Sequence, residues 1–193
     1  MIANYFTIVH VAHHLDKLLC GWTATEAFTQ HKGELVVRWN DLDSPAAETF
    51  LVAGCAPSQN VLFARKEFHR AKRNTLDVFP LLIGKQLARI RIHPADREVQ
   101  CEFSDGLRLL MQLFGSRANV LLVDDSRTVL DSFLRPKELV GTRLQQDVAR
   151  KPAFPDSEEE IRQRLQASTE STLLQGLKSA FPSLGTTLAN EVC

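Results

Sequence analysis

The spacing of apolar residues predicts one amphipathic helix near the start of the chain. From residue 8 to residue 19, apolar side chains recur at intervals of three and four, which is the period of a single helical face. The members of this face are Ile8, Val11, Ala12, Leu15, Leu18 and Leu19. Thr7 is a candidate N-cap and Gly21 a candidate stop. We therefore expect a helix over residues 8–19.

Short β-branched and aromatic runs, separated by turn residues, predict two groups of strands. The first group is Thr23–Phe28, Leu35–Trp39, Thr49–Ala53 and Val61–Ala64. The second group is Arg89–His93, Glu98–Phe103, Leu107–Leu113, Asn119–Val123 and Val129–Phe133. Within the second group Asp105-Gly106 is a tight-hairpin signal, and residues 124–127 form another turn. This order predicts an antiparallel meander.

The apolar spacing between the two groups predicts a second helix over Phe79–Ile90. Pro80 would lie in its first turn, where a missing N–H costs little. Gly84 inside the helix would cost about 1 kcal/mol relative to alanine.

The last part of the chain changes in character. Two prolines within residues 151–155 indicate a linker, and Asp156 or Ser157 then caps a helix. The first turn of this helix, Glu158-Glu159-Glu160, carries negative charge where the helix dipole favours it. Leu173, Leu174 and Leu177 supply the apolar side of the next helix.

A last predicted helix begins at Pro182 and reaches Cys193 without a stop signal, so the chain looks truncated inside a helical module. We predict an α+β domain over residues 1–150, an antiparallel β-sandwich or meander with flanking helices. Residues 151–193 would form the linker and the beginning of the helical module.

Composition limits the kind of protein. The chain has 193 residues, 44% of them hydrophobic, and no run approaches the length of a membrane helix. His10, His13 and His14 interrupt the early apolar stretch, which argues against a signal peptide. The cysteines are far apart and form no CxxC pair: Cys20, Cys55, Cys101 and Cys193. We expect reduced thiols and a cytoplasmic location.

Positive charge is concentrated in one third of a chain that is neutral overall. Arg65–Arg97 contains nine lysines and arginines against three acids, a net of +6, and each flank nets −3. A local excess of this kind can build a phosphate-binding surface, although most charge runs are solvated loops without a partner. Phe68 and His69 lie among the cations and offer faces for unpaired bases. The candidate RNA contacts in this run are Arg65, Lys66, Arg70, Lys72 and Arg73.

Patterns typical of enzymes are missing. His10 and His14 have the spacing of paired metal ligands, but no third ligand accompanies them. No Gly-x-Ser-x-Gly, Gly-x-Gly-x-x-Gly or Walker pattern occurs. We therefore expect a binding protein without catalysis, metal or cofactor. Asp96-Arg97 fits either a plain turn, with the carboxylate accepting backbone N–H groups, or a site that recognises a nucleotide.

The order of these motifs resembles the N-terminal (NFACT-N) domain of the bacterial Rqc2/RqcH-like proteins, historically called fibronectin-binding protein A. The resemblance covers essentially the whole chain, and Leu173–Val192 resembles the opening of the family's helix-hairpin-helix-like module. The motifs that carry it are Ala56-Pro57-Ser58, Lys85-Gln86-Leu87, Ile92-His93-Pro94-Ala95-Asp96-Arg97, the run 113–124 and Val129-Leu130-Asp131-Ser132.

The resemblance implies a role in ribosome-associated quality control. Members of the family bind large ribosomal subunits obstructed by peptidyl-tRNA, recruit tRNA, and support C-terminal alanine tailing of the stalled chain. The family's Asp-Arg pair, implicated in tRNA handling, maps onto Asp96 and Arg97. Gly115 and Asn119 match a second family pattern, with Arg117 one position late, so the resemblance adds Arg117 and Asn119 to the candidate RNA contacts. Asn4 stands where the family has an aspartate. The implied partners are tRNA, peptidyl-tRNA and large-subunit rRNA.

The fold implied by the resemblance is that of the N-terminal domain of formamidopyrimidine-type DNA glycosylases. Those enzymes use a proline amine after the initiator methionine, but this chain begins Met1-Ile2-Ala3, which removes the nucleophile. Two other functions stay open. One is a surface adhesin that binds fibronectin or fibrinogen, and the other is a catalytically inactive, glycosylase-like DNA binder.

Overall fold

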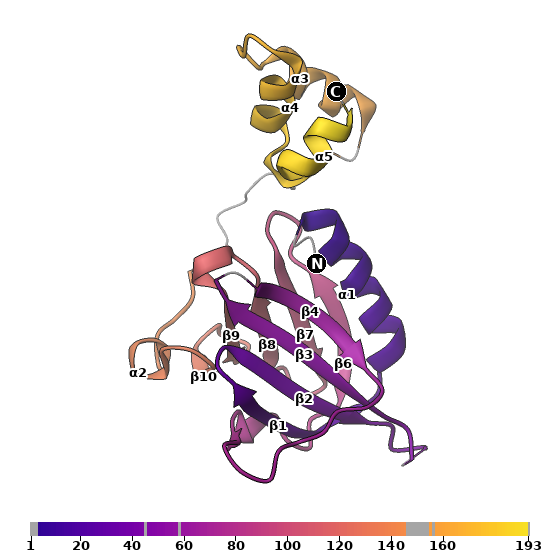
Figure 1. The fold of residues 1–193 in the computed structure, drawn as a ribbon, viewed down its shortest axis with the longest axis vertical. Helices are drawn as coiled ribbons and strands as arrows, with labels where there is room; N and C mark the ends of the chain where they lie inside the picture. The colour runs from indigo at the N-terminus through magenta and orange to yellow at the C-terminus, as the bar shows by residue number, and fades with distance from the viewer. Residues whose placement is uncertain (1–3, 45, 58, 146–154, 156, 193) are drawn as a thin grey trace.

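The computed structural model describes residues 4–44, 46–57, 59–145, 155 and 157–192. An N-terminal helix packs beside two antiparallel sheets, and a small group of helices follows at the C-terminal end (Figure 1). The predicted α+β class is confirmed. No helix among the described residues is long and apolar enough to cross a membrane.

Helix α1 spans Tyr5–Leu19, so it starts earlier than the apolar pattern suggests. Its N-cap is Asn4 and not Thr7, because the Asn4 Oδ1 atom accepts a hydrogen bond from the Thr7 backbone N–H at 2.8 Å. The helix stops before Gly21, whose φ of +87° suits glycine. Its buried residues are Ile8, Ala12, Leu15 and Leu19, which belong to the predicted apolar face.

Sheet A contains β1 (Thr23–His31), β2 (Glu34–Asn40), β3 (Glu48–Ala56), β4 (Gln59–Arg65) and the short β5 (Leu76–Asp77), in the order β4-β3-β2-β1-β5. Sheet B contains β6 (Leu87–Ile92), β7 (Glu98–Phe103), β8 (Arg108–Gln112), β9 (Asn119–Val123) and β10 (Val129–Ser132), in the order β10-β9-β8-β7-β6. All neighbouring pairs are antiparallel. Consecutive strands of sheet B are neighbours throughout, which confirms the predicted meander.

The two sheets enclose the main core between their inner faces. Leu35, Val37 and Trp39 of β2 belong to this core together with Leu109 and Met111 of β8. Alternate residues form separate apolar clusters on the outer faces, as the two-residue period of a strand requires. The cluster outside sheet A is Phe28, Val36, Phe50 and Val52, and the cluster outside sheet B is Leu110, Leu121, Val123 and Val129.

The sheets join at a corner between the start of β1 and the start of β6. The backbone N–H of Leu87 donates to the carbonyl of Trp22 at 2.8 Å, and the N–H of Gly21 donates to the carbonyl of Leu87 at 2.8 Å. These bonds fix the start of β6 beside the C-terminal end of α1. They thereby also position the turn between β6 and β7, residues 93–97, relative to α1.

The predicted helix over Phe79–Ile90 is wrong. A single 3₁₀ turn, η1 (Pro80–Leu82), is followed by Gly84 at a φ of +83° and then by strand β6. The register of β6 against β7 shifts between Leu87 and Arg89. This bulge places the buried residues Leu87 and Ile90 three positions apart, which imitates helical spacing.

The remaining elements are two short turns of helix in the sandwich and the helices of the C-terminal module. They are η2 (Gly115–Arg117), α2 (Pro136–Leu139), α3 (Glu158–Gln166), α4 (Leu173–Ala180), η3 (Pro182–Leu184) and α5 (Gly185–Val192). Ser157 is one of the two predicted caps of α3, and its hydroxyl accepts a hydrogen bond from the Glu160 backbone N–H. The last α-helix begins at Gly185, after the 3₁₀ turn at Pro182. The expected linker and the alternative cap Asp156 lie largely outside the described residues.

Candidate nucleic-acid interface

The basic run folds as a strap across the outer face of sheet A. The strap, Lys66–Thr75, joins β4 to β5. Phe68 packs edge-on against Phe28, with ring centroids 5.8 Å apart, and contacts Phe50 at 5.8 Å. Its ring therefore belongs to the apolar cluster of sheet A and is not displayed for stacking with bases.

Arg70 is bound within the fold. Its guanidinium lies 3.3 Å from the Glu26 carboxylate, 2.5 Å from the Asp77 carboxylate and 4.6 Å from the centre of the Phe28 ring. Burial by itself would lower the pKa of Arg70, but the hydrogen bonds to Asp77 and Glu26 raise it. Arg70 thus anchors the strap, and its charge is already balanced.

The other basic residues of the run differ from Arg70. Arg65 lies at the end of β4, with its guanidinium 5.4 Å from the Phe68 ring centre. Lys66, Lys72 and Arg73 are exposed. The predicted cationic surface is present on the strap, but two of its side chains, Phe68 and Arg70, turn toward the sheet.

The Asp96-Arg97 pair lies in the turn between β6 and β7, on the opposite sheet. The Asp96 Oδ1 atom accepts the Arg97 backbone N–H at 2.8 Å, and His93 Nδ1 accepts the Ala95 N–H at 3.1 Å. The Tyr5 hydroxyl donates to the Pro94 carbonyl at 3.2 Å, which ties the turn to α1. The carboxylate therefore has the turn-forming role that the sequence allowed, and these three hydrogen bonds stabilise the turn.

Asp96 also lines a groove on the outer face of sheet B. Three adjoining clefts, of about 670, 200 and 280 Å³, make up this groove. The first two share Arg127, Leu144 and Gln145, and the last two share Asp96, Gln112 and Phe114. The shared lining makes the clefts one continuous depression. Glu98 and Gln112, paired across β7 and β8, line its middle.

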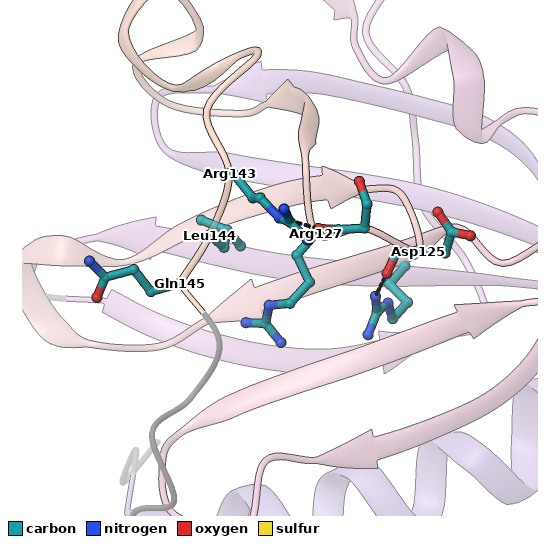
Figure 2. A pocket seen from close by; sticks show the side chains of 7 residues that line it. Asp125, Arg127, Arg143, Leu144 and Gln145 are labelled. Atoms are coloured by element: carbon teal, nitrogen blue, oxygen red, sulfur yellow. Dashed lines mark hydrogen bonds between the residues drawn. The ribbon is translucent and has the colours of Figure 1, made fainter.

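Arginines line the groove at both ends. Arg108, Arg127 and Arg143 line the large cleft, and Arg117 and Arg135 line the far end. Arg108 donates to the carbonyls of Asp124 and Asp125 at 3.2 and 3.0 Å, and Arg143 donates through Nε to the Ser126 carbonyl at 3.0 Å (Figure 2). Because these acceptors are neutral carbonyls, the bonds fix the side chains without neutralising their charges.

The β9–β10 turn positions Arg127. The Asp124 carboxylate accepts the Thr128 backbone N–H and the Ser126 hydroxyl, both at 2.8 Å. The Thr128 N–H and the Ser126 hydroxyl lower the pKa of Asp124 because they stabilise its ionised form. Arg127 itself has a φ of +66°, and its side chain extends into the cleft (Figure 2).

Asn119 belongs to the interior of the fold and not to a surface. It is 1% exposed, and its amide donates to the Ser132 hydroxyl and to the Leu134 carbonyl, each at 3.0 Å. Its Oδ1 atom accepts the backbone N–H groups of Val120 and Leu134 at 2.9 and 2.8 Å. The predicted RNA contact at Asn119 is therefore corrected, because a side chain so buried and so fully bonded holds β9 to the segment after β10.

The predicted contacts thus fall into two sets on opposite sheets. Arg65, Lys66, Arg70, Lys72 and Arg73 belong to the strap side, whereas Asp96 and Arg117 line the groove. Arg97 is not among the residues that line these three clefts. Sequence reasoning missed four residues that line the groove: Arg108, Arg127, Arg135 and Arg143. Each is separated in sequence from the others, and only the sheet topology brings them together.

No metal centre is evident in the described residues. His10 and His14 are exposed on α1, and no group of three or more His, Cys, Asp or Glu side chains gathers in the described ranges at a spacing suited to a metal ion.

No family model matches the sequence, and no curated protein does. Solved structures do match. The N-terminal domain of fibronectin-binding protein PavA from Streptococcus pneumoniae superposes with a TM-score of 0.79 at 19% identity, covering 98% of this chain and 78% of that one. The N-terminal part of the fibronectin/fibrinogen-binding protein from Streptococcus suis gives 0.78 at 17% identity, covering 98% and 78%. The fibrinogen-binding protein from Staphylococcus aureus gives 0.69 at 12%, covering 100% and 74%. The chain therefore has the fold of the N-terminal domain of PavA.

Proposed function

We propose that this chain is the RNA-binding N-terminal part of a cytoplasmic ribosome-associated quality-control factor. In this role it contacts tRNA and the rRNA of large subunits obstructed by peptidyl-tRNA, and it supports alanine tailing of the stalled chain by binding and not by catalysis. The observation that carries the proposal is the groove on sheet B, where five arginines line one continuous depression.

The chemistry of the groove suits RNA. Arginines contact phosphates bidentately, and they supply most of the salt-dependent affinity for nucleic acid. The acidic residues that line it are Asp96, Glu98 and Asp125, and Glu98 is 6% exposed and bonded to Gln100 and Gln112. The five arginines outnumber these three acids, so the lining has a net positive charge, although Arg135 also lies 3.9 Å from the Glu138 carboxylate. Asp96 beside His93 and Phe114 adds a carboxylate and two aromatic rings that could contact an unpaired base.

The ribosomal part of the proposal is supported by the sequence motifs around Asp96 and Arg97 and by their place in the fold. The pair occupies a fixed turn, and Asp96 lies at the middle of the groove. A ligand that follows the arginines would therefore pass this carboxylate.

Binding of tRNA, measured by fluorescence anisotropy at several salt concentrations, tests the proposal. The Arg117→Gln/Arg143→Gln variant removes two exposed cations from opposite ends of the groove. We expect about tenfold weaker binding and a salt slope smaller by about two, one for each lost phosphate contact. Arg162→Gln on α3 is the control, since it removes an exposed arginine away from the groove. Unchanged affinity and slope in the groove variant would refute the groove as the RNA site.

Co-sedimentation with large ribosomal subunits separates the ribosomal role from general RNA binding. We expect the chain to pellet with isolated large subunits and an Asp96→Ala/Arg97→Ala variant to remain in the supernatant. A damaged DNA duplex that displaces tRNA from the chain would instead favour the glycosylase-like DNA binder.

A second candidate function follows from the names of the similar structures, which are fibronectin- or fibrinogen-binding proteins. Surface plasmon resonance on immobilised fibronectin and fibrinogen tests it. Saturable binding that survives the groove substitutions, together with no measurable affinity for tRNA, would place the adhesin function ahead of the RNA-binding one.

A further inference from the structure

We infer that the strap is a second polyanion-binding surface, on the opposite side of the sandwich from the groove, and that its partner is the backbone of an RNA duplex. One molecule would then hold two RNA segments at once. The inference rests on the proposed RNA-binding function and adds to it a second site, its partner and its stoichiometry.

The two surfaces face in opposite directions. Phe68 of the strap packs on Phe28 and Phe50, which lie on the outer face of sheet A. Arg108 of the groove alternates with Leu109, which faces the core from sheet B. Because the core separates the sheets, a ligand in the groove leaves the strap accessible from the other side (Figure 1).

The strap is a fixed scaffold. Arg70 binds Glu26 and Asp77, while Arg38 binds Glu26 and Glu48, so a chain of ion pairs crosses the outer face of sheet A. The Gln30 side chain donates to the His69 carbonyl at 3.3 Å and accepts the Ala71 N–H at 2.9 Å. A loop held at its middle loses little conformational entropy when a ligand binds to it.

The inward and outward side chains of the strap differ in kind. Phe68 and Arg70, which face the sheet, are packed or ion-paired. Lys66, Lys72 and Arg73 are exposed, and within the described residues none of them forms an ion pair. The Gln30 bonds bring the strap beside the end of β1, where the exposed Lys32 follows in the hairpin. The result is a rim of exposed cations, with the exposed Glu67 among them, around a centre where two arginines pair with three carboxylates.

The kind of partner follows from what this rim lacks. Single strands are held by a row of aromatic faces on which successive bases stack. Of the two rings on the strap, Phe68 is packed against the sheet and only the imidazole of His69 is exposed, and one ring does not make such a row. The exposed lysines and arginines contact phosphates and read no sequence. A cationic loop of this kind fits the backbone of an A-form duplex better than a single strand.

A bridging assay tests the inference on the full chain. Biotinylated tRNA is immobilised, the protein is added, and capture of a fluorescent short RNA duplex is measured. We expect duplex capture by the unmodified chain and at least about tenfold less by the strap variant Lys66→Gln/Lys72→Gln/Arg73→Gln, with direct tRNA affinity changed by less than about twofold. A triple variant with the same charge change, Lys17→Gln/Arg89→Gln/Arg162→Gln, is the matched control, since all three residues are exposed.

The outcomes separate the inference from the function on which it rests. Duplex capture that is unchanged in the strap variant, or lost equally in the matched control, overturns the second site. So does native mass spectrometry that finds only one RNA per protein at saturation. A fluorescent single strand captured as well as the duplex overturns the choice of partner. No tRNA binding by the unmodified chain refutes the proposed function itself.

Discussion

Trp39 of β2 stacks on Phe103 of β7, with ring centroids 6.1 Å apart and planes only 3° from parallel. Both side chains are buried, and they come from different sheets, so this contact joins the two halves of the sandwich at its core. The strap and the groove lie on the outer faces of these sheets. Loss of the aromatic contact would therefore loosen the frame that separates the two surfaces.

Phe103→Ala should lower the free energy of unfolding by about 3–5 kcal/mol, because it removes a buried ring and leaves a cavity beside Trp39. Urea unfolding followed by tryptophan fluorescence measures it. Leu81→Ala serves as the control, since Leu81 is 53% exposed and its truncation should cost little. A change in Phe103→Ala as small as in the control would contradict the stacking as a source of stability.

Asn119→Ala should destabilise the fold by about 1–3 kcal/mol or more, because it strips partners from buried groups, among them the Leu134 N–H and the Ser132 hydroxyl. At a temperature where the variant is folded, its affinity for tRNA should match that of the unmodified chain. Thermal unfolding by circular dichroism and anisotropy on the same sample give both quantities. Weaker tRNA binding with unchanged stability would restore Asn119 as a direct contact.

Burial separates the reactivities of the cysteines. Cys55 and Cys101 are buried and Cys20 is exposed, so alkylation of the native protein should label Cys20 long before the other two. Peptide mapping by mass spectrometry assigns each site and reads Cys193 separately. Rapid labelling of Cys55 or Cys101 in the folded protein would show that the core opens far more readily than this packing implies.

The same burial predicts alkaline sensitivity. Desolvation raises the pKa of Cys55 to about 12 from 9.0, and it also raises the pKa of Cys101. Between pH 9.0 and about 12, the Cys55 thiol keeps its proton in the folded state but loses it in the unfolded state. The free energy of unfolding should therefore fall as the pH rises above 9.0. Urea midpoints at increasing pH measure this, and a Cys55→Ala/Cys101→Ala variant should show a weaker decline.

Arg70→Gln should release the strap, since it removes the ion pairs to Glu26 and Asp77. Trypsin cleaves after lysine and arginine, and the strap offers Lys66, Lys72 and Arg73 as sites. We expect faster cleavage there in the variant and in high salt, with the rest of the domain intact. Lys32→Gln, which changes the charge nearby without removing an anchor, should leave the cleavage rate unchanged.

Helix α1 could be predicted because its buried face follows the helical period, which identified Leu15 and Leu19. The strands could be predicted because short β-branched and aromatic runs, such as Leu35–Trp39 in β2, are bounded by turn residues. The region from Phe79 to Ile90 could not, since a bulge in β6 shifts the phase of the pattern. Phe79 and Gly84 at positive φ end the 3₁₀ turn on either side, and neither conformation can be recognised from apolar spacing.

Contiguous charge predicted the basic run, and the family resemblance predicted Asp96 and Arg117 of the groove. The basic run was evident, but its division into anchoring and displayed residues depends on Glu26 and Asp77, which lie on other strands. Arg108 and Arg143 meet at the groove because β8 and the segment after α2 approach the same turn. No local sequence pattern predicts that these two arginines lie close together, because their proximity depends on the order of the strands.

The corner at Leu87 has a consequence for synthesis of the chain. Strands β1–β4 pair with sequence neighbours and are complete before any residue of sheet B leaves the ribosome. Until β6 arrives, the Trp22–Leu87 bond cannot close, and the inner face with Leu35, Val37 and Trp39 has α1 but no second sheet to cover it. We therefore expect the half-made protein to expose part of an apolar sheet face while residues 66–120 are being translated.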